Sequence, residues 1–165
     1  MKRPLWKRLL LVLGAYIYAS YAVTLTQAVT RVELPQPVVE RVGGPTAPVG
    51  GDGCWTVSQA FNAYTRLDRP AYTWGVTGRY CVENGRIRDD PFSTVDIGNT
   101  HGAYGYTNGE VEAIPWGPEG ETLRLNAWGQ FEVCVLRFIC GGWSHSSMSV
   151  TVFADGRTPV SDAWT

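Results

Sequence analysis

The sequence predicts an all-β fold: an antiparallel β-sandwich of the jelly-roll or Ig-like kind, preceded by an N-terminal hydrophobic helix and a Pro/Gly-rich tether. Three observations lead to this prediction. From residue 54 onward, apolar and polar side chains alternate with the period of two that half-buried strands require. Turn signals built on Gly and Asn separate these runs. The one helical pattern, over residues 57–65, fits a strand followed by a turn better.

We divide the chain of 165 residues into three parts. Residues 1–30 form a signal anchor or signal peptide, residues 31–53 a linker and residues 54–165 an extracytoplasmic β domain. The β domain is long enough to bury a core of its own.

The first part of the chain holds an uncharged, largely apolar segment, residues 9–30, between Arg8 and Arg31. Lys2, Arg3, Lys7 and Arg8 precede it, without any acidic residue. An apolar helix of about 20 residues can cross a bilayer, and flanking positive charge stays preferentially in the cytoplasm. The sequence therefore predicts that everything after Arg31 is exported.

Two interpretations of this segment stay open. As an uncleaved anchor, residues 9–30 would make the membrane a partner and leave the β domain outside the cell membrane. As a signal peptide, the segment would be cleaved after Ala22, where Ser20-Tyr21-Ala22 offers small residues at the required positions, or after Ala28. The protein would then be secreted.

The linker over residues 31–53 is rich in proline and glycine. Such a composition sustains neither a helix nor a central strand. We expect an extended tether.

The four cysteines, Cys54, Cys81, Cys134 and Cys140, all follow the export segment. An even number in an extracytoplasmic domain predicts two disulfides. We favour Cys54–Cys81 with Cys134–Cys140. The second bond requires a bend within residues 135–139, and a crossed pairing follows if those residues stay extended. No CxxC pair is present and the two histidines are far apart, so we expect no metal and no cofactor.

Seven or eight short strands are predicted. The candidates, in chain order, are residues 55–61, 71–82, 92–97, 111–116, 122–128, 130–140, 147–153 and 158–160. The turn signals are Asn84-Gly85, Asn108-Gly109 and Asp155-Gly156. Residues 130–140 are apolar on both faces, which is typical of a covered central strand or of a strand that is bent partway. Pro159 restricts the last strand to a sheet edge.

Aromatic residues give the strongest indication of function. Trp55 and Trp74 lie in strand-like surroundings, which predicts a place in the core. A second group lies beside Gly or Pro in expected loops, where aromatic side chains often form binding surfaces. The predicted binding residues are Trp116, Trp143, Tyr104 and Tyr106.

Polar residues offer a weaker alternative, a small secreted hydrolase acting on glycan. Glu110 and Glu112 would share one strand face, as paired carboxylates in glycoside hydrolysis require, and His101 lies in a glycine-flanked segment. His145 beside serines has no nucleophile motif around it. A solvated strand face explains the two glutamates better, and an exposed turn explains His101 better, so we assign no catalytic residue.

The β domain is mildly acidic and has no basic cluster, which argues against nucleic acid as a partner. The segment Gly129-Gln130-Phe131-Glu132-Val133-Cys134, followed by Cys140 and by Asp155-Gly156, resembles small exported, Trp-rich β-domain proteins of unknown function from actinobacteria. The resemblance covers the last third of the chain. It differs in the spacer between the two cysteines, which is apolar here rather than turn-like. The resemblance supports the predicted export and the predicted β fold, and it implies no activity.

The functional expectation is therefore an exported, non-catalytic binding or interaction protein of the cell envelope. Its partner would be an envelope protein or a glycan. The alternatives are the hydrolase described above and a purely structural surface component.

Overall fold

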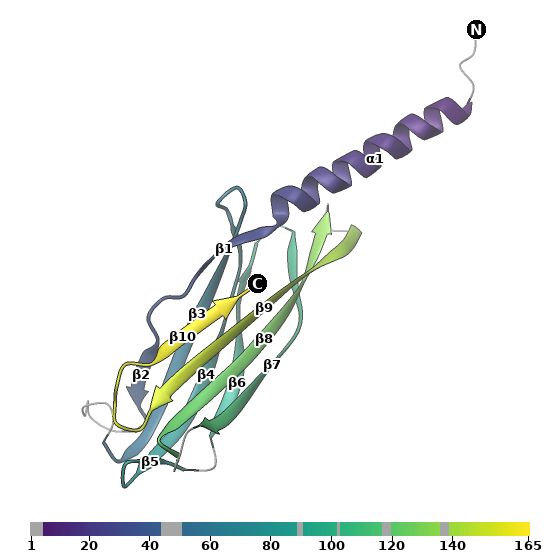
Figure 1. The fold of residues 1–165 in the computed structure, drawn as a ribbon. Helices are drawn as coiled ribbons and strands as arrows, with labels where there is room; N and C mark the ends of the chain where they lie inside the picture. Colours follow the sequence, from purple (N-terminus) through teal and green to yellow (C-terminus); the bar gives the residue numbers. More distant parts are fainter. Residues whose placement is uncertain (1–4, 44–50, 89–90, 102, 117–119, 136–138) are drawn as a thin grey trace.

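The computed structural model describes residues 5–43, 51–88, 91–101, 103–116, 120–135 and 139–165. One helix, α1 (Leu5–Gln27), precedes two antiparallel sheets that pack on each other (Figure 1). Sheet A contains β1 (Val29–Glu33), β2 (Val38–Arg41), β3 (Gly53–Thr65), β4 (Pro70–Glu83), β5 (Arg86–Ile87) and β6 (Phe92–Thr100). Sheet B contains β7 (Tyr104–Trp116), β8 (Thr122–Val135), β9 (Ile139–Phe153) and β10 (Val160–Trp164). The all-β prediction is confirmed.

The strand order within sheet B, β10-β9-β8-β7, follows the chain. In sheet A, β3, β4 and β6 are likewise consecutive neighbours apart from the two-residue β5. Within each sheet, each long strand therefore pairs with the next by a hairpin-like connection, and the step from β6 to β7 passes from sheet A to sheet B. Jelly rolls and Ig domains need longer crossover connections, so neither of these predicted subtypes is confirmed.

Helix α1 projects away from the two sheets (Figure 1). Its described large apolar side chains are exposed all around the helix; Leu9 is 71% exposed, and Leu11 and Val12 are each 70% exposed. In the part of the chain that the structure describes, no helix combines the length and the apolar character needed to cross a membrane.

The tether expected over residues 31–53 is partly sheet, which corrects that prediction. β1 and β2 both pair antiparallel with β3, one along each half of it. Pro35 and Pro37 fall in the break between these two edge strands, where a missing N–H costs no sheet hydrogen bond. The folded domain thus begins at Val29 rather than at Cys54. Residues 44–50 of the expected tether lie outside the described residues.

Two predicted strand boundaries were wrong in sheet B. Asn108-Gly109 lies inside β7 at an irregularity in register, and neither residue has the positive φ of a tight hairpin turn. There the Thr107 hydroxyl donates to the Gln130 carbonyl, 2.9 Å away. Asn84 and Gly85, by contrast, have φ values of 54° and 73° and form the predicted turn.

The other correction concerns residues 122–140. Gly129 interrupts no strand, because β8 runs without a break from Thr122 to Val135. The bent alternative for 130–140 is confirmed, since β8 and β9 form a hairpin in which Cys134 is the register partner of Cys140. The final strand begins at Val160, two residues later than the start predicted for it.

The core lies between the inner faces of the sheets and is dominated by aromatic residues. Trp55 and Trp74 are each 2% exposed, as predicted. The rings of Tyr72 (β4) and Phe131 (β8) stack across the sheets with centroids 3.7 Å apart. Burial raises the pKa of Tyr72, while the hydroxyls of Ser144 and Ser146 that bond its oxygen oppose the rise.

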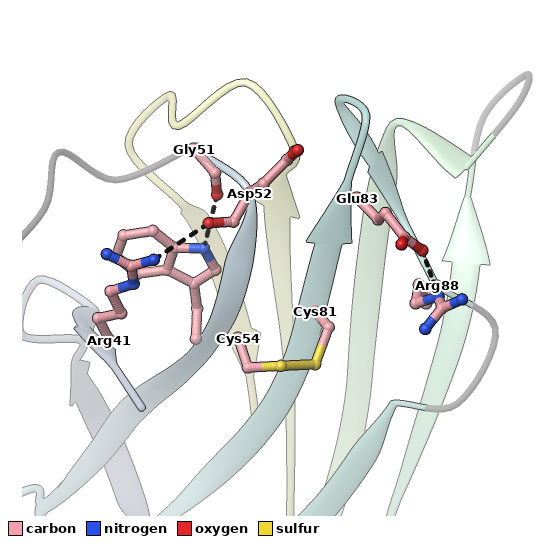
Figure 2. The surroundings of a disulfide bond; sticks show 8 residues. Arg41, Gly51, Asp52, Cys54, Cys81, Glu83 and Arg88 are labelled. Carbon is pink, nitrogen blue, oxygen red and sulfur yellow. Dashed lines mark hydrogen bonds and ion pairs between the residues drawn. A yellow bond between two sulfur atoms is a disulfide. The ribbon is translucent and has the colours of Figure 1, made fainter. Parts of the chain in front are cut away.

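Both disulfides have the predicted pairing. Cys54–Cys81 joins β3 to β4 in sheet A (Figure 2), and Cys134–Cys140 joins β8 to β9 in sheet B. The first lies at the end of the sheets far from α1, and the second lies at the α1 end, where Cys134 donates its N–H to the Ala103 carbonyl. Two disulfides fit an oxidising, extracytoplasmic compartment.

Hydrogen bonds and an ion pair connect the chain segments that surround the sheet A disulfide (Figure 2). The indole N–H of Trp55 donates to the Gly51 carbonyl at 3.2 Å, and Arg41 donates to the Asp52 carbonyl at 3.3 Å. Arg88 pairs with Glu83 at 2.8 Å on the other side. These contacts fix the end of the sheet at which the disulfide lies.

Candidate functional site

The four predicted binding aromatics do not come together. Tyr104 is 7% exposed, its ring meets Tyr72 edge-on at 5.4 Å, and its hydroxyl donates to the Gln27 carbonyl. Tyr106 packs edge-on against Phe131 at 5.6 Å. Both tyrosines therefore pack against the aromatic core, because strand alternation turns them inward rather than into a loop.

Trp143 and Trp116 lie toward opposite ends of sheet B. Trp143 is the register partner of Glu132 on β8, and Trp116 is the partner of Thr122 on the same strand. The intervening length of β8 amounts to roughly 30 Å at the rise of an extended strand, so the two residues belong to no common site. Trp143 is 57% exposed, whereas the side chain of Trp116 lies outside the described residues.

The outer face of sheet B carries a different set of tryptophans. Leu123, Leu125 and Ala127 of β8 point into the core, so alternation turns Trp128 outward. The same alternation exposes Trp143 on β9 and Trp164 on β10. Trp128 is 37% exposed and Trp164 is 53% exposed. Among the described residues, every exposed tryptophan outside α1 lies on this face.

Trp128 and Trp164 line a groove of about 530 Å³. The register places Trp128, Ser147 and Trp164 in one row across β8, β9 and β10. Neighbouring strands are about 5 Å apart, so the two indoles rise from the sheet about 10 Å apart with only a serine side chain between them. This large-small-large order hollows the face. The polar side chains that complete the lining are Glu110, Glu112, Arg124, Asn126 and Ser147.

The groove is acidic. Glu110 and Glu112 alternate along β7 and share its outward face. Within the described residues, neither carboxylate has an ion-pair or hydrogen-bond partner for its side chain. Arg124, the cation of the lining, donates its Nε–H to the Ser149 hydroxyl at 2.7 Å.

The residues considered for hydrolysis are dispersed. His101 follows β6 at the α1 end, where its N–H donates to the Ala71 carbonyl at 2.9 Å. Glu110 and Glu112 lie farther along β7, beside the groove. Both carboxylates rise from one strand and therefore stand on the same side of the groove, whereas glycoside hydrolysis needs two that flank the scissile bond.

One group of potential metal ligands comprises Glu132, Cys134 and Cys140, whose ligand atoms lie within 4.8 Å of one another. The two sulfurs are joined to each other in a disulfide. They are therefore not the thiolates that bind zinc.

Sequence reasoning missed both groove tryptophans. The alternation of Thr122 to Trp128 contained the signal for Trp128, which must face away from the leucines. Trp164 had no such signal, because the last strand was placed over residues 158–160.

A scan against protein-family models and searches of the curated proteins and the solved structures find no match for this chain.

Proposed function

We propose that this protein is exported and acts, without catalysis, by binding a saccharide of the cell envelope in the groove between Trp128 and Trp164. One observation carries the proposal: two exposed indoles about 10 Å apart flank a hollow that carboxylate, amide and hydroxyl groups line. The C–H face of a sugar ring packs on an indole, and its hydroxyls hydrogen-bond to such polar groups. A site on strands is also more rigid than one on loops.

Export is supported by the basic residues that precede residue 9, by the uncharged segment that follows them and by the two disulfides. The protein is either anchored through residues 9–30 or cleaved after Ala22 or Ala28. Intact mass of the protein from washed membranes and from the medium separates these forms. A full-length chain found only in the cytoplasm would contradict export.

Saccharide binding is tested on a glycan array with the exported protein and two single variants, Trp128→Ala and Trp164→Ala. Each variant should weaken binding about tenfold or more, as central aromatic contacts do. Trp143→Ala is the matched control, because Trp143 is exposed on the same sheet face and does not line the groove. Absence of saccharide binding, or an equal loss in the control, would contradict the proposal.

A hydrolase remains the second candidate, because Glu110 and Glu112 both line the groove. The assay is release of reducing ends from the bound saccharide across acidic and neutral pH. Turnover that Glu110→Gln or Glu112→Gln abolishes would make the protein an enzyme. We expect binding without turnover, since the two carboxylates stand on one side of the groove.

A further inference from the structure

We infer that the saccharide in the groove is cationic: it carries amino groups that are protonated at neutral pH. This inference rests on the proposed saccharide site and adds its charge selectivity. It follows from the carboxylates that surround the two indoles, and from the absence of ion pairs to those carboxylates within the described residues.

Carboxylates dominate the outer face of sheet B. The described acidic residues that alternation places on this face are Glu110, Glu112, Glu132 and Asp162. No ion pair involves any of them within the described residues. Arg124 is the one arginine that the register places on this face among the described residues. A ligand in the groove therefore meets a surplus of negative charge.

The indoles add to this preference. A tryptophan face attracts an ammonium group within about 6 Å of the ring, and it does so more strongly than tyrosine or phenylalanine. Trp128 is the direct register partner of Glu110, which places an aromatic ring and a carboxylate side by side. A protonated amino sugar would use both groups at once, whereas a uronic acid or a sulfated sugar would be repelled.

The test compares the affinities of the exported protein for two trisaccharides with the same backbone, measured by calorimetry. One is the trimer of glucosamine and the other is the trimer of N-acetylglucosamine. A mildly acidic buffer keeps the amines of the glucosamine trimer protonated. The glucosamine trimer should bind roughly tenfold more tightly, and the advantage should shrink as salt is added because exposed charges are screened.

The double variant Glu110→Gln/Glu112→Gln keeps side-chain shape and removes both charges. It should abolish the preference for glucosamine, by weakening binding of the glucosamine trimer far more than binding of the N-acetylated trimer. Glu40→Gln is the matched control, because Glu40 lies on edge strand β2 of the other sheet. Circular dichroism and thermal melting confirm that each variant is folded.

The outcomes separate this inference from the proposed function. Equal or tighter binding of the N-acetylated trimer, or binding of neutral or acidic saccharides alone, overturns the cationic ligand and keeps the saccharide site. Binding that chelation of calcium abolishes also overturns it, because the carboxylates would then hold a bridging ion. Failure of every saccharide to bind contradicts the proposed function itself.

Discussion

The two sheets differ most on their outer faces. On sheet A, the polar groups of the outer face and its adjoining hairpin largely satisfy one another. Arg31 donates to Asp68 at 2.6 Å, pairs with Glu33 and lies 4.0 Å from the ring centre of Tyr64. Asp68 raises the pKa of Arg31 chiefly by accepting this hydrogen bond. This cluster attaches β1, and with it the base of α1, to the β3–β4 hairpin.

Sheet B satisfies less of its outer face, where Arg124 donates to the Ser149 hydroxyl. Its exposed indoles and its groove carboxylates have no partners of this kind among the described residues. A hollow of about 270 Å³ exists on sheet A too, at Gly75 and Gly98, but the Thr77 hydroxyl already donates to Asp96 at its rim. A hollow shape alone therefore does not indicate a binding site. Aromatic and charged side chains without partners around the hollow do indicate one.

Removing the disulfide of each sheet in turn should lower the free energy of unfolding by different amounts. Cys54→Ala/Cys81→Ala opens a link between residues 27 apart, and Cys134→Ala/Cys140→Ala one between residues 6 apart. The chain-entropy relation gives a loss of about 3.5 kcal/mol for the sheet A bond and about 2.2 kcal/mol for the sheet B bond. Urea unfolding at neutral pH measures both. An equal or larger loss for the sheet B pair would contradict the loop-length argument.

Alkaline pH should destabilise both sheets through buried tyrosines, among them Tyr80 in sheet A and Tyr104 in sheet B. Burial raises the pKa of Tyr80 on β4 and of Tyr104 on β7 to about 12, with Tyr72 adding to the rise at Tyr104. In the unfolded chain both ionise near pH 10. Above about pH 10 the unfolded state therefore loses protons first, and the free energy of unfolding falls as pH rises toward 12.

Phenylalanine variants distinguish these two tyrosines. Tyr80→Phe should flatten the alkaline decline and leave stability at pH 7 nearly unchanged. Tyr104→Phe should flatten it too, but at pH 7 it also loses the hydrogen bond to the Gln27 carbonyl, a cost of about 1 kcal/mol. The free energy of unfolding is measured by urea titrations at a series of pH values between neutral pH and just below pH 12. An unchanged decline in both variants would show that other groups control it.

The smallest expected effect concerns the exposed face of sheet B. Trp164→Ala and Trp143→Ala should change the free energy of unfolding by no more than about 0.5 kcal/mol, because both side chains are more than half exposed. Phe131→Ala, fully buried against Tyr72, should cost about 3–5 kcal/mol in the same assay. A large loss at Trp164 would assign it a structural role and weaken the contrast between the faces.

The sequence by itself determined the features that depend on local pattern. The alternation of residues 147–153 predicts a strand with Met148 and Val150 inward, as found. The Asn84-Gly85 turn follows from two residues that tolerate positive φ. The sequence indicated two disulfides, but it left a crossed pairing open until the β8–β9 hairpin placed Cys134 opposite Cys140.

Only the tertiary structure decided where the candidate site lies. Tyr104 and Tyr106 beside a glycine looked like loop aromatics, but β7 continues through the Asn108-Gly109 pair because its neighbour β8 supplies the hydrogen bonds of a strand. The groove depends on a register that joins Trp128 to Trp164 through Ser147. Residues so distant along the chain meet only through strand pairing, and no local pattern of side chains encodes that register.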